Sequence, residues 1–239
     1  MPKHLPLLPL CVLLASLLLG CGGLDSGGSG AVSSVNPGVY LPSSTPFGKT
    51  YGEWSAAWWQ WVLAIPRADN PILDLTGAKA AIGQAGPVWF LAGGPADGTE
   101  RTCTVPADKA ILFPIWNGFG EIPIDGTTKT ALGAALKTYT DYITALAVTV
   151  DTRSLQGLAY YRFRSPLFEY TMPDPPDAYW DIYAGTHQGM SEGYWIMLEP
   201  LVPGEHTIRF YCKFVMPPSS PYGEPYVDEK WTTYHLTVE

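Results

Sequence analysis

The fold is decided by the stretch 207–214, which reads Thr-Ile-Arg-Phe-Tyr-Cys-Lys-Phe. Apolar side chains occupy every second position from Ile208 to Phe214. A period of two buries one face of a β-strand and leaves the other face in water. The stretch 234–238, Tyr-His-Leu-Thr-Val, repeats the alternation. A turn is expected at 202–205, because Pro and Gly stand where a type II turn favours them.

The other strand candidates are short and are separated by proline and glycine turns. Several such strands in series are typical of a β-sandwich. We therefore predict a mainly β fold with two helices, a β-sandwich of immunoglobulin-like or jelly-roll-like type. The remaining expected strands are 87–92, 101–105, 110–116, 147–151, 160–164, 168–172 and 194–199.

A tryptophan-rich helix is expected before the strands. Thr50 and Glu53 have the spacing of a capping box, so the helix should begin there and end at Pro66. Its apolar stripe should pack on the sandwich. Trp59 lies away from the centre of the stripe and is the tryptophan we expect to be exposed. The stripe consists of Tyr51, Trp54, Trp58, Trp61 and Ile65.

A second helix is expected over 128–146, because apolar residues recur there at helical spacing. The strand 147–151 would leave this helix directly. One face of the helix would carry Leu132, Leu136, Tyr139, Ile143 and Leu146.

The chain opens with a basic, then apolar segment that ends in Leu-Leu-Leu-Gly-Cys at residues 17–21. Leu-x-Gly-Cys resembles a bacterial lipobox, which implies a signal peptide at 1–20 and fatty acylation of Cys21. An ordinary cleaved signal and a retained anchor are the alternatives. The apolar stretch 5–19 is shorter than the roughly 20 residues that span a bilayer. The resemblance implies a cell-envelope lipoprotein, and Gly22 after the cysteine implies the outer membrane.

Residues 21–46 are rich in Gly, Ser and Pro and bury too little apolar area to offset their ordering entropy. We predict a flexible tether over 21–46 and one globular domain over 47–239. The 239 residues are 46% hydrophobic and 15% charged, which allows a sizeable core. The net charge of −8 argues against nucleic acid as a partner and against docking on anionic lipid heads. The predicted partner is the membrane, through the lipid, and no cofactor is expected.

Two cysteines remain once Cys11 leaves with the signal and Cys21 carries lipid. Cys103 and Cys212 are predicted to form a disulfide, because free thiols are uncommon in exported proteins. Two separate buried thiols are the alternative.

Several short motifs are spread through the domain: Tyr-Gly-Glu-Trp (51–54), Trp-Trp-Gln-Trp (58–61), Gly-Gln (83–84), Gly-Pro-Val-Trp-Phe-Leu-Ala-Gly (86–93), Thr-Cys-Thr-Val-Pro (102–106), Lys-Ala (109–110), Phe-Pro-Ile (113–115), Pro-Gly (203–204) and His-Thr-Ile (206–208). By these motifs the domain resembles an uncharacterised family of exported bacterial proteins, over roughly residues 46–238. Relatives often carry a cysteine near the position of Ala80, which this chain lacks. No activity is established for that family, so the resemblance implies no catalytic residue.

Aromatic side chains are the candidate ligand-binding residues, because they combine large contact area with polar groups. The stretches 173–192 and 216–231 are read as long loops that mix aromatic and acidic residues. Ordinary covering loops, with aromatics packed on the sheets, are the alternative. The candidates are Trp59, Tyr179, Trp180, Tyr183, Tyr222, Tyr226 and Trp231.

Metal binding and catalysis have weaker support. Asp174, Asp177 and Asp181 could supply calcium ligands, but their spacing matches no EF-hand loop, so no metal site is predicted. The sequence contains no Gly-x-Ser-x-Gly, no His-Glu-x-x-His, no P-loop and no dinucleotide-binding motif. Glu121, expected in a loop that follows 117–120, is the weak catalytic candidate.

The sequence therefore favours a lipid-anchored envelope protein that binds a glycan or another envelope component without catalysis. A hydrolase of envelope polysaccharide, with Glu121 and a second acid as its catalytic carboxylates, is one alternative. A structural or assembly lipoprotein that works through protein partners is the other.

Overall fold

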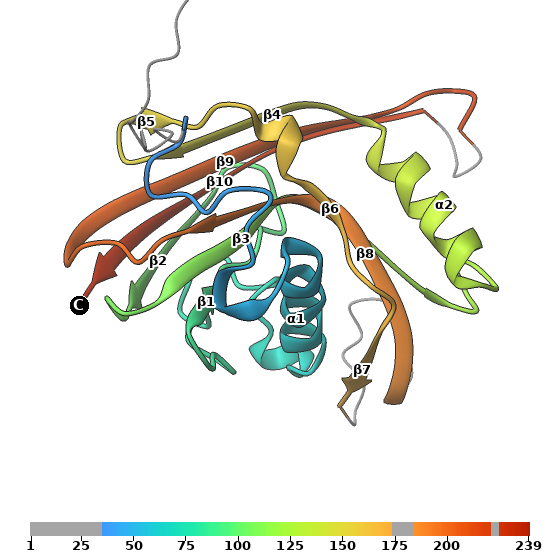
Figure 1. Ribbon diagram of the computed structural model, residues 1–239, viewed down its shortest axis with the longest axis horizontal. Helices are drawn as coiled ribbons and strands as arrows, with labels where there is room; N and C mark the ends of the chain where they lie inside the picture. The colour runs from blue at the N-terminus through green and yellow to red at the C-terminus, as the bar shows by residue number, and fades with distance from the viewer. Residues whose placement is uncertain (1–34, 174–183, 221–224) are drawn as a thin grey trace, which may run out of the picture. The chain divides into compact units, whose positions relative to one another are not determined.

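Two β-sheets pack face to face in the computed structural model, which describes residues 35–173, 184–220 and 225–239. These residues belong to one compact unit, Ser34–Glu239. The unit also holds two α-helices. Figure 1 shows the long strands of the two sheets running across the molecule in two layers.

The first sheet, sheet A, has the strand order β1-β3-β8-β6, and β7 also pairs with β8. β1 and β3 are parallel, and the other pairs are antiparallel. The strands are β1 (Val88–Phe90), β3 (Ala110–Ile122), β6 (Arg162–Arg164), β7 (Phe168–Met172) and β8 (Gly185–Leu198).

The second sheet, sheet B, has the order β2-β10-β9-β4-β5, with β2 and β10 parallel and the other pairs antiparallel. Its strands are β2 (Thr99–Val105), β4 (Ile143–Val150), β5 (Arg153–Ser154), β9 (Gly204–Met216) and β10 (Tyr226–Val238).

The alternating stretch 207–214 lies on β9 and builds the core between the sheets. Phe210 stacks on Phe113 of β3 with ring centroids 5.1 Å apart, and Phe214 stacks on Trp116 at 6.0 Å. The intervening positions of β9 face away from sheet A. The prediction of a mainly β fold with two helices, arranged as a sandwich, is confirmed.

Helix α1 (Tyr51–Leu63) covers the other face of sheet A. Its capping box is present as predicted: the Thr50 side chain accepts from the Glu53 amide, and Glu53 accepts from the Thr50 amide. Trp58 donates to the Leu91 carbonyl at 3.0 Å and packs edge-to-face on Trp195 of β8. The prediction that the apolar stripe packs on the sandwich is therefore confirmed.

Helix α2 (Lys129–Thr140) lies on the opposite face of sheet A from α1. Ser191 and Trp195 of β8 contact α1, whereas their neighbour Met190 packs on Leu132 of α2. Successive side chains of a strand point to opposite faces. Sheet A is therefore a middle layer, with α1 on one face and sheet B together with α2 on the other (Figure 1).

The expected extent of α2 was wrong. The helix ends at Thr140, and Ile143 and Leu146, placed on its apolar face by spacing alone, lie on β4. β4 pairs with β9 along 143–150, so sheet pairing outweighs the helical pattern there. Similarly, β6 begins at Arg162, after a 3₁₀ turn at Leu158–Tyr161.

The expected tether ends earlier than residue 46. Asn36 and Val39 are buried, 6% and 3% exposed, and the Tyr40 amide donates to the Met197 carbonyl at 3.0 Å. Pro46 is buried too, and its carbonyl accepts from the Trp54 indole at 2.9 Å. Residues 36–46 are thus part of the folded unit. No helix within the described ranges is long and apolar enough to cross a bilayer.

The predicted disulfide is wrong, because Cys103 and Cys212 are free. Cys103 pairs with Leu236 of β10 on one side, and Cys212 pairs with Lys230 on the other. β10 thus separates the cysteines sideways, and their partners are about 20 Å apart along it at ~3.3 Å per residue. A disulfide needs Cα atoms within about 7 Å. The structure instead has the alternative arrangement, two separate thiols.

Candidate functional site

A cavity of about 720 Å³ lies beside the distal part of β3. β1 pairs only with Ala110–Leu112, so β8 is the one lateral strand neighbour of the rest of β3 among the described residues. The cavity passes around this edge and meets α1 on one face of sheet A and α2 on the other. It is lined by Trp59, Asn117, Gly118, Phe119, Glu121, Ile124, Asp125, Leu132, Ala135, Leu136 and Tyr139.

Aromatic side chains form much of the cavity wall. Trp59 of α1 stacks on Phe119 of β3 with centroids 4.7 Å apart, and Tyr170 of β7 meets Phe119 edge-on at 5.3 Å. On the α2 side, Tyr139 packs 4.8 Å from Phe214. Apolar walls with a few polar groups are the usual composition of a ligand site.

Trp59 was predicted to be exposed, and this is wrong: it is 3% exposed. Its position off the centre of the helical stripe turns it toward Phe119 at the end of β3 instead of toward water. It nevertheless lines the cavity, so a ligand there would touch its ring.

Polar groups gather where β3 ends. Asp125 Oδ2 accepts the backbone N–H of Glu121 at 2.9 Å, and the Tyr170 hydroxyl donates to Glu121 Oε2. Burial and the bond to Glu121 raise the pKa of Tyr170, so the phenol remains a neutral donor. Glu121 was expected in a loop, but β3 continues to Ile122 and Glu121 lies on the strand.

Neither carboxylate at the cavity has a basic partner in the described part of the chain: none of its ion pairs includes Glu121 or Asp125. The described lining contains no Lys, Arg or His. Asn117 adds a buried amide nitrogen, Nδ2, with no hydrogen-bond partner among the described residues. The cavity therefore offers negative charge, and a buried amide nitrogen without a partner belongs to one of its lining residues.

A smaller pocket of about 210 Å³ adjoins the cavity and shares Trp59 and Asn117 with it. It opens between β3 and sheet B, where Lys230 Nζ lies 2.8 Å from Asp228 Oδ2. Cys212 also lines it, and burial raises the pKa of that thiol to about 12. The thiol is thus protonated at neutral pH, and the charged groups of this pocket are already paired.

Two of the predicted ligand residues lie on β10, which begins at Tyr226, so the expected loop 216–231 is shorter than predicted. Tyr226 is 51% exposed, and its ring lies 6.3 Å from Phe214. Trp231 lies on the outer face of sheet B, between Tyr211 at 4.5 Å and the Arg209 guanidinium at 3.9 Å. Trp231 and the cavity are thus on different faces of sheet B.

The other predicted aromatic residues, Tyr179, Trp180, Tyr183 and Tyr222, lie outside the described residues, as do the lipidation residue Cys21 and the acids Asp174, Asp177 and Asp181. The loop expected at 173–192 is also shorter than predicted, because β8 begins at Gly185.

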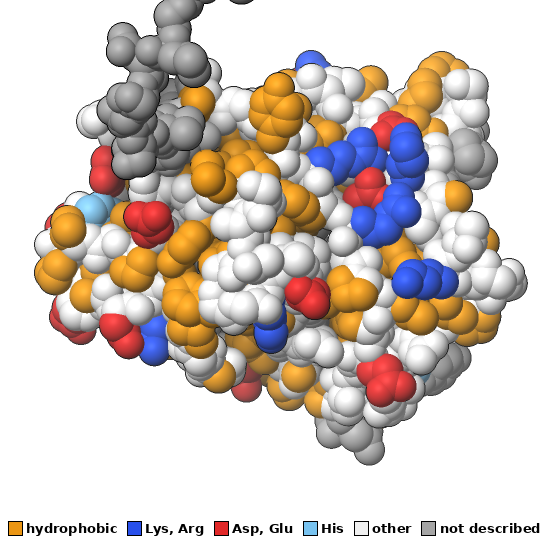
Figure 2. Space-filling view, viewed as in Figure 1, with side chains coloured by type: hydrophobic (Ala, Val, Ile, Leu, Met, Phe, Trp, Pro, Cys, Tyr) orange, Lys and Arg blue, Asp and Glu red, His pale blue; other side chains and the backbone are white. Residues whose placement is uncertain are grey.

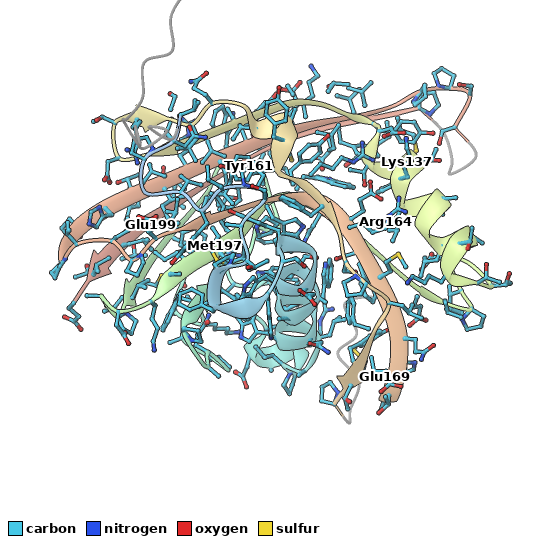
Figure 3. The ribbon with its side chains drawn as sticks, viewed as in Figure 1. Lys137, Tyr161, Arg164, Glu169, Met197 and Glu199 are labelled. Carbon is cyan, nitrogen blue, oxygen red and sulfur yellow. The ribbon has the colours of Figure 1, made fainter. Side chains whose placement is uncertain are left out.

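A second group of charged side chains lies on another part of the surface. Glu192, 5% exposed, is bound by Arg162 and Arg164, and Arg162 also reaches Asp141 at 2.6 Å. Figure 2 shows basic side chains gathered around acidic ones on this face, and Figure 3 labels Lys137 and Arg164 there. Every carboxylate of this group has a cationic partner, so the group ties β6, β8 and α2 together.

Sequence reasoning found Trp59 and Glu121 but missed Asn117, Asp125 and Tyr139. Tyr139 was placed on the apolar face of the second helix, and the structure places it on α2, where it is half-buried. Asp125 gave no signal, because its role depends on a turn that returns its side chain to the Glu121 amide. Within the described residues, no group of three or more His, Cys, Asp or Glu is arranged to hold a metal ion.

No protein-family model and no curated protein matches the chain. A cysteine protease inhibitor from Entamoeba histolytica is similar in structure with a TM-score of 0.23 and 14% identity, covering 63% of this chain and 93% of that protein. Amebosin gives a TM-score of 0.22 at 14% identity, covering 64% of this chain and all of that protein. Scores this low transfer neither fold nor function.

Proposed function

We propose that this chain is a non-catalytic binding protein of the bacterial cell envelope, held to the outer membrane by fatty acids on Cys21. Its ligand is a glycan that enters the cavity beside β3. The net charge of −8 and the envelope location both argue against a nucleic acid partner.

The composition of the cavity is the observation that carries this proposal. Phe119 and Tyr139 offer ring surface to the apolar face of a sugar, with the buried Trp59 behind Phe119, and Asn117 and Glu121 offer polar groups to its hydroxyls. A volume of about 720 Å³ lies within the usual range of small-ligand sites, roughly 300–1,000 Å³.

A polysaccharide hydrolase is the second candidate, because Glu121 and Asp125 both line the cavity. Glycosidase carboxylates flank the scissile bond from two sides. Here both acids come from one short segment, 121–125, and Asp125 is bonded to the Glu121 backbone. Glu121 is also bonded by Tyr170. These contacts favour binding over hydrolysis.

The test is calorimetric titration of the full chain in detergent with oligosaccharides prepared from envelope glycans. Tyr139→Ala should weaken binding by at least about tenfold, because it removes ring contact from the wall. Asn117→Ala should weaken it without altering that wall. Tyr160→Ala is the matched control, since Tyr160 is exposed and outside the cavity.

Unchanged affinity in both cavity variants would refute the cavity as the glycan site. Release of shortened oligosaccharides during incubation, abolished by Glu121→Gln, would replace the binding proposal with the hydrolase. Thermal unfolding of each variant separates lost binding from lost structure.

A further inference from the structure

We propose that the glycan carries a free, protonated amino group, and that the Glu121 and Asp125 carboxylates bind this group within the cavity. The inference rests on the proposed function and adds the chemical class of the ligand. It is carried by a cavity whose aromatic walls, unpaired carboxylates and absence of basic lining residues in the described chain all favour a cation.

Glu121 and Asp125 are the acids that line the cavity, and other acids of the fold show how a carboxylate is paired with a cation. Asp141 is paired with Lys137 and Arg162, and Glu229 is paired with Lys213 at 2.7 Å. Glu121 and Asp125 have no such partner among the described residues, although they border a recess. A ligand ammonium would supply the missing positive charge, whereas an anionic ligand would meet two negative charges with no compensation.

Each carboxylate retains an oxygen that can accept a ligand N–H. Asp125 uses Oδ2 for the Glu121 amide, and Glu121 uses Oε2 for the Tyr170 hydroxyl. The second oxygen of each acid has no hydrogen-bond partner in the described part of the chain. An ammonium group has three donors, so it can serve both oxygens and a further acceptor.

The aromatic wall favours the same ligand. A cation near the face of Trp or Tyr is attracted by the ring quadrupole. Trp59 and Tyr139 line the same cavity as the two acids, from α1 and α2 respectively. A sugar ring against these side chains shares the cavity with the two carboxylates, so an amine on the ring lies among groups of opposite charge.

A matched ligand pair tests the inference: a short oligomer of glucosamine and the same oligomer fully N-acetylated, at a pH where the free amines are charged. The full chain in detergent should bind the free-amine oligomer about tenfold more tightly, as expected when charge-assisted hydrogen bonds are gained. The preference should shrink with added salt, because the carboxylates are partly exposed.

The double variant Glu121→Gln with Asp125→Asn should abolish the preference, since the amides keep the shape and remove the charge. Glu199→Gln is the matched control; Figure 3 shows Glu199 far from the α2 side of the molecule. Thermal unfolding checks that the double variant is folded.

The outcomes separate the two proposals. Equal binding of both oligomers, or a preference that survives in the folded double variant, overturns the amine inference and leaves glycan binding intact. Binding of neither oligomer, together with no binding of any envelope glycan, removes both. Tighter binding of a lysine oligomer than of the glucosamine oligomer would overturn the sugar in favour of a basic peptide.

Discussion

The Arg101 guanidinium donates to the Tyr234 hydroxyl at 2.8 Å, and both side chains are buried between sheet B and the segment before β1. Arg101 is 1% exposed and also donates to the carbonyls of Ile72, Asp74 and Ala92. One buried cation on β2 therefore satisfies backbone acceptors from two separate loops.

Arg101→Ala should lower the free energy of unfolding by about 3–5 kcal/mol, because it leaves several buried carbonyls without a donor and opens a cavity. Urea unfolding followed by tryptophan fluorescence measures this. Arg153→Ala, at an exposed position on β5, is the control and should stay within about 0.5 kcal/mol of the parent protein. A loss of similar size in both variants would contradict the role given to Arg101.

Thr50→Ala should destabilise the fold by about 1 kcal/mol. The Thr50 side chain accepts from the Glu53 amide, so its removal leaves a helix amide without its cap. Chemical unfolding provides the value. Ser44→Ala, which removes an exposed hydroxyl bonded to Leu41 outside the helix, is the comparison and should cost less.

The His206 contact should make stability depend on pH near neutrality. Burial opposes the charged imidazole, but hydrogen bonds from its ring nitrogens to Asp151 at 3.0 Å and to the Val202 carbonyl at 2.9 Å outweigh it and raise the pKa of His206. The nearby Glu205 acts in the same direction. A raised pKa means that the folded protein binds the proton more tightly than the unfolded chain.

The stabilisation from His206 is therefore complete below the ordinary pKa of 6.5 and is lost as the pH rises through the higher folded value. Melting temperatures measured from about pH 6 to about pH 8 should fall in the parent protein and fall less in His206→Gln. A melting temperature that falls more steeply with pH in His206→Gln than in the parent protein would contradict the stabilising role of protonated His206.

Cys103 and Cys212 should remain reduced and unreactive in the folded protein. Burial raises the pKa of both thiols to about 12, and thiolate is the reactive form. Iodoacetamide should label them only after denaturation, and the intact mass should be the same with and without reductant. A native mass lower by two hydrogens would restore the disulfide.

Cys21→Ser should move the protein from the membrane fraction to a soluble one, because the proposed anchor is the acylated cysteine. Mass measurement of the N-terminal peptide of the parent protein should find fatty acid on Cys21. Persistent membrane association of an unacylated variant would contradict lipid anchoring.

Local periodicity was enough to predict most of the strands. The alternation at 207–214 and the run at 168–172 needed no information from the rest of the chain. Helix α2 shows the limit: Ile143 and Leu146 satisfy helical spacing, yet both pair with residues of β9 in sheet B. Pairing between segments distant in the sequence decides such cases.

The candidate site could be predicted only in part, for the same reason. Trp59 and Glu121 stood out as single residues, but the cavity exists because α1, the end of β3 and α2 meet there. The prediction of a disulfide was wrong because an exported location and the number of cysteines suggest that thiols pair, but neither shows which strands lie side by side. Only the strand order shows that β10 runs between the two cysteines.

Sheet A, covered on both of its faces, should give the slowest amide exchange in the domain. The shared backbone hydrogen bonds of β3 and β8 can reach water only when helices and sandwich come apart together. The outer face of sheet B, around Trp231, is different because its side chains already contact solvent in the folded protein. Deuterium uptake at β3 and β8 would thus report the global unfolding equilibrium, and the turns joining β4 to β5 would report local opening.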